Sequence, residues 1–207
     1  MGNREALLQA AKRCLFEQGY GNTTARDIAT AAGTSLAAIG YHYGSTEALL
    51  NAAMIEAMGE WGDQIAVTLA QEAPADDTAG ADEDPLSHFQ RFWERVLESF
   101  ADQRQIWAAS FELFGLVDRV PEIRRQLAVA TEESRVGLGE LFGGVDPATD
   151  LERARAVGSF YHALISGVIA QWLIDPERAP TAEQITEGLR IVAAIGRTPA
   201  AAEATPH

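Results

Sequence analysis

The stretch TTARDIATAAGTSLAAIGYHYGSTEALL, residues 23–50, decides the fold of the first part of the chain. Within it, SLAAIGYHY (35–43) has the pattern of a very short helix with an interior glycine. Isolated helices shorter than about 12 residues are marginal in water, and an interior Gly costs roughly a further 1 kcal/mol relative to Ala. We therefore expect neighbouring helices to hold this segment in place.

The residues before this segment predict a helix that ends in a tight turn. Thr24 with Asp27 three residues later matches a capping box, Ala29 is small enough for close helix contact, and Gly33 can adopt the left-handed conformation. The positions expected to face each other between the two helices are apolar: Ile28, Ala32 and Ile39. This pattern predicts a helix-turn-helix, whose second helix could enter a DNA major groove, although an ordinary helical hairpin could carry Ala and Gly at the same places.

The same stretch resembles the DNA-binding domain of the tetracycline-repressor (TetR) family, whose pattern runs roughly T-T-x-x-x-I-A-x-x-A-G-V-S-x-G-x-I/L-Y-x-H-F-x-S-K-E-x-L. The resemblance covers about residues 5–55, and the matching positions are Thr24, Ile28, Ala29, Ala32, Gly33, Ser35, Ile39, His42, Ser45, Glu47 and Leu49. It implies a homodimer that binds a palindromic double-stranded DNA operator, usually to repress. It also implies release when a small-molecule effector enters an all-helical C-terminal domain.

Three positions depart from the family pattern. Gly40 stands where the family usually has tyrosine, and Tyr43 stands where it has phenylalanine. Thr46 replaces the lysine that reaches a phosphate in the family, so a hydroxyl takes the place of one charge-assisted contact per subunit. We expect Tyr43 to keep its ring in the core with its hydroxyl at the edge.

By this resemblance and by their chemistry we assign DNA contact to one set of residues: Thr24, Arg26, Thr34, Ser35, Leu36, Ala37, Gly40, Tyr41, His42 and Thr46. The fork of Arg26 matches O6 and N7 of guanine, although a salt bridge to Asp27 or a plain surface role is an open alternative. Tyr41 and His42 offer donors to phosphate, and His42 could instead pack on a ring.

The charge distribution separates the first 50 residues from the remainder. Four basic and four acidic residues cancel in residues 1–50, so residues 51–207 carry the whole net charge of −14. An acidic body would repel phosphate and orient DNA toward the neutral end, although acidic surface also simply keeps a protein soluble. The N-terminus lacks the uninterrupted apolar run of a signal peptide, and we expect no membrane contact and a cytoplasmic location. Cys14, the single cysteine, is expected to be a buried structural thiol.

Helical periodicity continues along the chain and predicts an all-α fold of about nine helices. We expect a helix-turn-helix DNA-binding domain at 1–50, a helical-bundle ligand-binding and dimerisation domain at 51–198, and a disordered tail at 199–207. Residues 72–86 are acidic and rich in Pro and Gly, which predicts a solvated loop. Expected helices of the second domain begin near 105, at Pro121, at a Thr149 capping box and at a Thr181 capping box.

The helix expected at 149–173 is apolar on two faces. One face is studded with small residues at Gly158, Ala163 and Gly167, which suit the close approach of another helix. We therefore expect it and the helix at 181–196 to pair with their copies across a two-fold axis, the alternative being one larger monomeric core.

An aromatic effector site is expected on the central helices of the second domain. Its candidate residues are Phe89, Trp93, Trp107, Phe111, Phe114, Tyr161 and His162, with Glu112, Tyr161 or His162 as polar handles. Taken singly, each of these rings is interpreted as plain core, and only together do they indicate an aromatic cavity. A hydrophobic or aromatic effector fits such a cavity better than an anion.

Other functions receive little support from the sequence. It has no H-E-x-x-H motif, no glycine-rich phosphate loop and no nucleophile beside a histidine, and GLGELFGG (137–144) is interpreted as a helix end. We expect no enzyme activity, no metal and no cofactor. The serious alternative is a helical carrier of apolar ligands whose head is degenerate and does not bind DNA.

Overall fold

The computed structural model describes residues 2–72 and 86–197, and within them every regular element is helical. The expected acidic loop at 72–86 and the expected tail at 199–207 fall almost wholly outside the described residues. The elements are α1 (Asn3–Gln18), the 3-10 turn η1 (Tyr20–Asn22), α2 (Ala25–Ala32), α3 (Leu36–Tyr43), α4 (Thr46–Glu72), α5 (Ser87–Ser99), α6 (Arg104–Phe114), α7 (Pro121–Gly143), α8 (Leu151–Ile174) and α9 (Ala182–Arg197). The prediction of an all-α fold with nine α-helices is confirmed for the described part of the chain.

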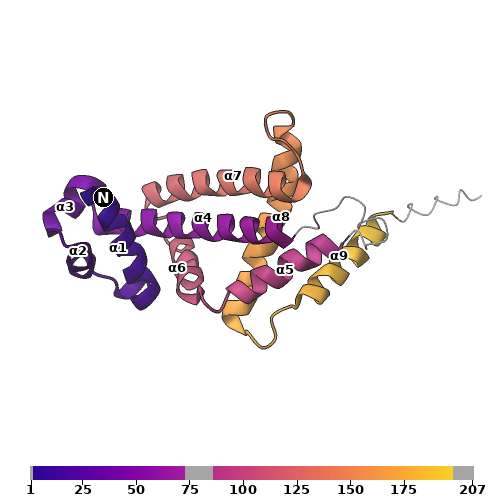
Figure 1. Cartoon of the computed structure of the whole chain (residues 1–207), viewed down its shortest axis with the longest axis horizontal. Coiled ribbons are helices and arrows are strands. Elements are labelled where there is room, and N and C mark those ends of the chain that lie inside the picture. Colours follow the sequence, from indigo (N-terminus) through magenta and orange to yellow (C-terminus); the bar gives the residue numbers. More distant parts are fainter. Residues whose placement is uncertain (1, 73–85, 198–207) are drawn as a thin grey trace, which may run out of the picture.

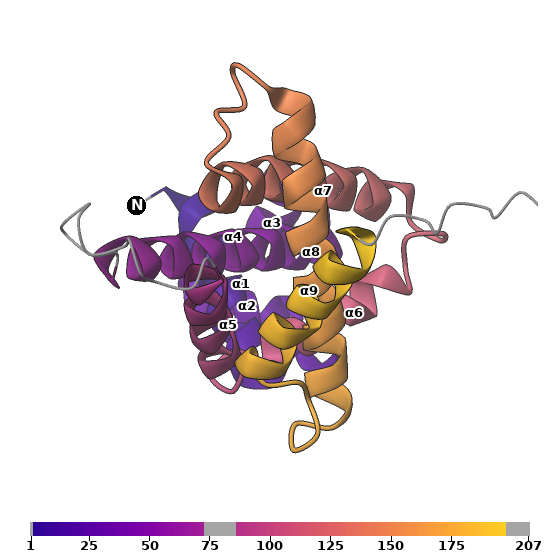
Figure 2. The same ribbon diagram turned by 90° about the vertical axis from the view of Figure 1, so that its right-hand side faces the viewer.

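The helices form a small head and a larger body (Figure 1). The head is α1, α2 and α3, and the body is α4 to α9. The long α4 leaves the head and runs beside α7 through the body, while α8 crosses α7 steeply (Figures 1 and 2). α9 packs against α5 at the far end of the molecule from the head.

Several helix ends follow directly from the sequence. The side chain and backbone of Thr24 exchange hydrogen bonds with Asp27, which completes the expected capping box of α2. Thr181 and Gln184 form the same reciprocal pair at the start of α9. At the start of α8 the prediction was wrong by one residue, because Asp150 accepts from the Arg153 amide while the hydroxyl of Thr149 is donated to Asp146 O.

Two hydrophobic cores hold the fold together. The head core joins α1 to α4 and also includes residues of α6 and α7: Ile106, Ala109, Leu113 and Ile123. The body core lies among α4, α5, α6, α8 and α9 and is rich in aromatic rings. Cys14 is buried in the head core, where burial raises the pKa of its thiol, as expected for a structural cysteine.

The contact between α7 and α8 depends on two glycines. A Cβ at Gly139 would lie 2.0 Å from the Ala154 carbonyl oxygen, and one at Gly158 would lie 1.6 Å from the Arg135 carbonyl oxygen. Gly158 therefore faces α7 of its own chain, which corrects its assignment to the dimer face. The backbones of these two helices approach too closely for any side chain at either position.

α8 is the one helix of the described ranges that is long and apolar enough to cross a membrane by length and composition. The mean hydropathy of its most apolar window is 1.4, and 22% of that window is buried inside the chain. Gly, Ser, His and Gln interrupt its apolar run without lowering its mean hydropathy much. A helix at the interface of two soluble subunits would pass the same test.

Candidate nucleic-acid interface

α3 is held by its inner side and exposes its outer side. Ile39 is buried against Ile28, and Gly33 turns the chain between α2 and α3 in the left-handed conformation (φ 64°). The Thr34 amide donates to the Ala29 carbonyl at 3.0 Å, which closes the end of α2. The predicted helix-turn-helix is therefore present, and packing supplies the stability that so short a helix lacks alone.

The structure places most of the predicted DNA-contacting residues on the surface of the head. Tyr41 is 85% exposed and Leu36 is 52% exposed, which is unusual for large apolar side chains. The other predicted residues divide by exposure: Thr24, Arg26, Ser35, Ala37 and Gly40 are exposed, whereas Thr34, His42 and Thr46 are half-buried. Because α3 presents its exposed side chains on one side, this surface can meet a groove without rearrangement.

The aromatic end of α3 is partly fixed by local contacts. The His42 ring meets the Tyr41 ring edge-on, with centroids 4.9 Å apart. The Tyr43 hydroxyl donates to the Arg4 carbonyl at 2.9 Å, and the Arg4 guanidinium lies over the Tyr43 ring. Tyr43 is half-buried and packs against the head core, as expected for its ring and its hydroxyl.

Thr24 already uses its hydroxyl inside the head. It donates to Asp27 Oδ2 at 2.6 Å and accepts from the Asp27 amide at 3.3 Å. The Thr24 hydroxyl and the Thr24 amide both donate to Asp27 Oδ2, and these two hydrogen bonds lower the pKa of the Asp27 carboxyl, so the group remains ionised. A phosphate near Thr24 would therefore also meet a negative charge.

Only some of the head's basic groups are available to phosphate. Lys12 is buried and pairs with Glu56 at 3.2 Å and also with Glu60, both on α4. Arg13 donates to the Ala31 carbonyl at 3.2 Å. Arg26 is exposed and forms no ion pair within the described part of the chain, so the alternative of a salt bridge to Asp27 is not realised.

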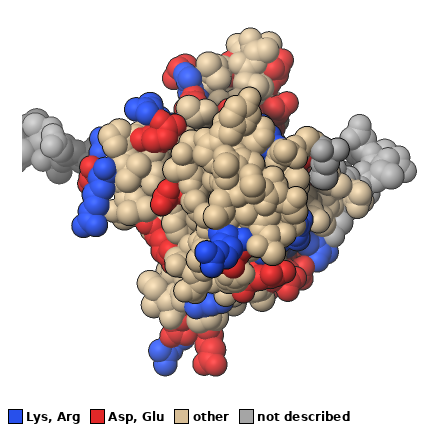
Figure 3. All heavy atoms as spheres, turned by 90° about the vertical axis from the view of Figure 1, so that its left-hand side faces the viewer, with Lys and Arg blue, Asp and Glu red and all other residues tan. Residues whose placement is uncertain are grey.

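The charge on this face is correspondingly sparse. Figure 3 shows the head end of the molecule as a broad uncharged surface with separate basic and acidic groups around it and one basic group in its lower part. At the start of α4, Ser45 caps the helix by accepting from the Ala48 amide at 3.0 Å, and Thr46 stands beside it. Contact with DNA would therefore depend on hydroxyls, backbone amides and few cations.

The candidate effector residues occupy the body core unevenly. Phe89, Trp93 and Trp107 are buried, Phe111, Tyr161 and His162 are half-buried, and Phe114 is 47% exposed. The ring of Phe89 contacts those of Trp93 and Tyr161 at centroid distances of 6.3 and 5.8 Å. Phe111 contacts Phe114 separately, at 5.5 Å, and Glu112 is exposed. The structure brings Phe89, Trp93 and Tyr161 together and leaves Phe114 at the surface.

Further rings join this aromatic cluster, among them Phe142 and Phe92. Phe142 stacks on Tyr161 with centroids 4.3 Å apart and an interplanar angle of 22°, and Phe92 lies 4.3 Å from Phe142. Phe142 escaped the sequence analysis because it stands directly before Gly143 and Gly144, where the helical pattern ends. Its distance from the other rings in the sequence gave no signal of contact.

Polar groups in and beside the cluster are only partly satisfied. The indole Nε1 atoms of Trp93 and Trp107 are buried and have no acceptor among the described residues. His162 Nδ1 lies 3.1 Å from Ser134 Oγ, and burial together with the charge of Arg135 lowers the pKa of the imidazole. His162 is therefore neutral at pH 7.

Two surface hollows lie outside this cluster. One, of about 520 Å³, runs between α4 and α7, and the other, of about 460 Å³, lies beside α6 and the start of α7. Phe114 lines the second hollow, and none of the other predicted effector residues lines either.

α8 and α9 each carry exposed apolar side chains. Phe160 is 45% exposed, and Ile191, Val192 and Ile195 on α9 are 52%, 66% and 68% exposed. Ala163 and Gly167 lie exposed on the same helix as Phe160, and a Cβ at Gly167 would meet nothing within 4 Å among the described atoms. We call Phe160, Ala163, Gly167, Ile191, Val192 and Ile195 the α8–α9 face.

Comparison with known proteins agrees with this architecture. The model of bacterial regulatory proteins of the tetR family matches residues 7–53, which span the helix-turn-helix. The HTH-type transcriptional regulator TtgR of Pseudomonas putida is 29% identical over 189 residues, covering 84% of this chain and 81% of TtgR.

Solved structures share the whole fold. The multidrug binding protein EbrR, complexed with proflavin, has a TM-score of 0.60 at 20% identity, covering 92% of this chain and 99% of that one. A TetR transcription regulator from Haloarcula marismortui has a TM-score of 0.55 at 20% identity, covering 93% and 95% of the two chains. Residues 7–53 thus match the DNA-binding domain of the tetR family of bacterial regulatory proteins, and most of the chain is similar to HTH-type transcriptional regulators.

Proposed function

We propose that this protein is a dimeric, ligand-responsive repressor that binds a palindromic DNA operator and releases it when a small hydrophobic or aromatic effector binds in the body. The observation that carries the proposal is α3, which Ile39 anchors in the head core while Leu36 and Tyr41 stand exposed on its outer side. A regulator of this kind acts in the cytoplasm, where the DNA is.

The α8–α9 face supports the dimer. Apolar side chains exposed together mark an interaction surface, and a two-fold axis lets the same patch meet itself. Such a dimer would carry two copies of α3, as half-sites one helical turn apart on DNA require. Ala163 and Gly167 would allow the two copies of α8 to approach closely.

The composition of the body core supports the proposal of an aromatic effector. Leaving a buried donor without an acceptor costs about 1–3 kcal/mol, and the Trp93 and Trp107 indoles both lack one among the described residues. An aromatic molecule with a hydrogen-bond acceptor could replace a ring contact and satisfy such a donor. EbrR, which shares the fold, binds proflavin in its solved structure.

α6 offers the route by which the effector would act on the head. It contributes Trp107 to the body core and Ile106 to the head core, and it contacts both α1 and α8. A displacement of α6 by an effector would thus shift α1, which contacts α3. Binding of effector and of operator would then weaken each other by the same factor.

A gel-shift titration against the DNA that flanks its own gene tests the proposal. Wild-type protein should shift this DNA at low salt, Tyr41→Ala should weaken binding to all sequences about equally, and Arg26→Ala should relax sequence preference. Mass spectrometry of molecules that co-purify with the body would identify the effector class. A dimer that gives no shift at low salt would instead favour the carrier of apolar ligands, an alternative supported by the scarcity of free cations on the head.

A further inference from the structure

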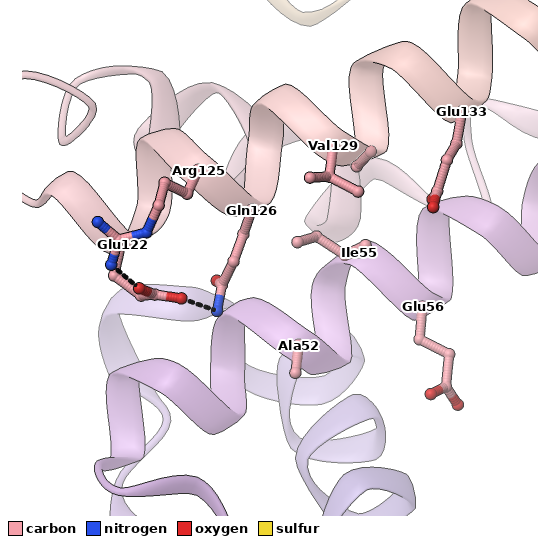
Figure 4. A pocket seen from close by; sticks show the side chains of 9 residues that line it. Ala52, Ile55, Glu56, Glu122, Arg125, Gln126, Val129 and Glu133 are labelled. Carbon is pink, nitrogen blue, oxygen red and sulfur yellow. Dashed lines mark hydrogen bonds and ion pairs between the residues drawn. The ribbon is translucent and has the colours of Figure 1, made fainter.

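The hollow between α4 and α7 lies apart from both the α8–α9 face and the aromatic cluster. Figure 4 shows its apolar middle, where Ile55 of α4 and Val129 of α7 point toward each other. Val129 is 58% exposed, and Ala52 and Ala130 widen the apolar strip around it. The volume, about 520 Å³, lies within the usual range for small-molecule sites, roughly 300–1,000 Å³.

One end of the hollow holds a buried acceptor that lacks a donor. Gln126 Nε2 donates to Glu122 Oε1 at 3.1 Å, which fixes the amide, while Gln126 Oε1 is buried without a donor from any described residue. Glu122 also pairs with Arg125 (Figure 4), so its charge is balanced locally. This oxygen is closed to solvent, so a donor from an added molecule would reach it after the Gln126 side chain rotates toward the hollow.

The other end holds an uncompensated negative charge. Glu133 extends toward α4 in Figure 4 and forms no ion pair with the residues that the structure describes. Glu56 also borders the hollow, but its carboxylate points away from α7 and binds Lys12 at 3.2 Å. The charge left inside the hollow is thus that of Glu133, which favours a cation and repels an anion.

The spacing of the two ends defines the length of the occupant. Gln126 and Glu133 are two helical turns apart on α7, which is about 10.5 Å along the axis at 1.5 Å per residue. We propose that this hollow is a second ligand site, which binds an elongated apolar diamine with one amino group at Glu133, the other at Gln126 and its hydrocarbon chain on Ile55 and Val129. The site goes beyond the proposed effector core and shares no residue with it.

Isothermal titration of the full-length protein with 1,8-diaminooctane tests this site. Wild type should bind saturably, and Glu133→Gln and Gln126→Met should each weaken binding about tenfold, because each removes one polar end of the site. Octylamine, which has one amino group, should also bind about tenfold more weakly, and octanoate should not bind.

The matched control is Glu140→Gln, because Glu140 is also an exposed glutamate of α7. A chain with a net charge of −14 attracts cations in general, and this variant removes one negative charge outside the hollow. Its affinity for the diamine should match that of wild type, and circular dichroism should show that all three variants are folded. Equal affinities in all variants, or no saturable binding to wild type, would overturn the proposal without touching the proposed operator or effector core.

Discussion

Lys12 shows that part of the head's positive charge stabilises the fold and is not available to DNA. It is 6% exposed and reaches from α1 to Glu56 and Glu60 on α4, where Gln9 also donates to Glu56 at 3.1 Å. Burial opposes its charge, but the hydrogen bonds to the two glutamates outweigh burial and raise the pKa of the ammonium. These contacts fix the head on the helix that connects it to the body.

We expect Lys12→Met to lower the free energy of unfolding by about 1–2 kcal/mol at pH 7, because it leaves two carboxylates without their cation. The Lys12 contribution is complete below the pKa of an unfolded lysine, about 10.4, and is lost as pH rises through the higher pKa of the folded state. Urea unfolding from pH 7 to 11 should show the two proteins converging at high pH. Arg178→Met, which breaks an exposed pair with Asp175, should change stability by at most about 0.5 kcal/mol.

Thr46 carries a second prediction for a single residue. With Lys12 buried and Thr46 in place of the family's lysine, few cations reach phosphate. The logarithm of DNA affinity falls with the logarithm of salt by about 0.9 for each neutralised phosphate, so Thr46→Lys should steepen the slope by about 1.8 in a dimer. Fluorescence-anisotropy titrations at several salt concentrations measure this slope. Equal slopes for wild type and Thr46→Lys would show that position 46 does not approach phosphate.

At the scale of helices, the glycines of the α7–α8 contact decide whether these two helices can pack together. Gly158→Ala would place a methyl group 1.6 Å from the Arg135 carbonyl oxygen, which forces the two backbones apart. Overpacking of this kind costs about 1–3 kcal/mol or more, so its midpoint of thermal unfolding should fall by several degrees.

Gly137→Ala is the matched control on α7. It is exposed, and a Cβ there would meet nothing within 4 Å among the described atoms. An exposed Gly→Ala change inside a helix should stabilise by about 0.5–1 kcal/mol. If Gly158→Ala melted no lower than Gly137→Ala, the close packing of α7 on α8 would be refuted.

Helix positions and caps followed from the sequence because they depend on neighbours a few residues apart. Thr24 with Asp27 and Thr181 with Gln184 formed the expected pairs, and Gly33 took the expected left-handed turn. Gly158 was misassigned because the sequence shows that a helix approaches there but not which one. Likewise, the contact of Phe142 with Tyr161 joins α7 to α8 and depends on how the two helices cross.

For the candidate DNA surface, the sequence predicted the exposed side of α3 but not the state of the hydroxyls and cations around it. Local spacing placed Leu36 and Tyr41 outward and Ile39 inward. The bond from Thr24 to Asp27 and the burial of Lys12 depend on rotamers and on a helix distant in the sequence. Neither the bond nor the burial can be predicted from spacing along the sequence.

At the scale of the whole molecule, the head and the body share a hydrophobic core and are not joined by a linker alone. Ile106 and Leu113 of α6 and Ile123 of α7 lie in the head core, together with α4 as far as Ala57. The head core therefore extends past residue 50, the expected domain boundary. This shared core is the route by which the proposed effector response would pass from the body to α3.

The proposed dimer gives the last prediction. Phe160→Glu on α8 and Ile195→Glu on α9 each place a carboxylate on the α8–α9 face, where the two-fold axis would bring the buried charge close to its copy. Each variant should sediment as a monomer at micromolar concentration and bind the operator at least about tenfold more weakly, because one head reaches only one half-site. Val67→Glu, on α4 and 55% exposed, adds the same charge elsewhere and should remain dimeric. If all three variants sedimented as dimers, the subunits would have to meet through another surface.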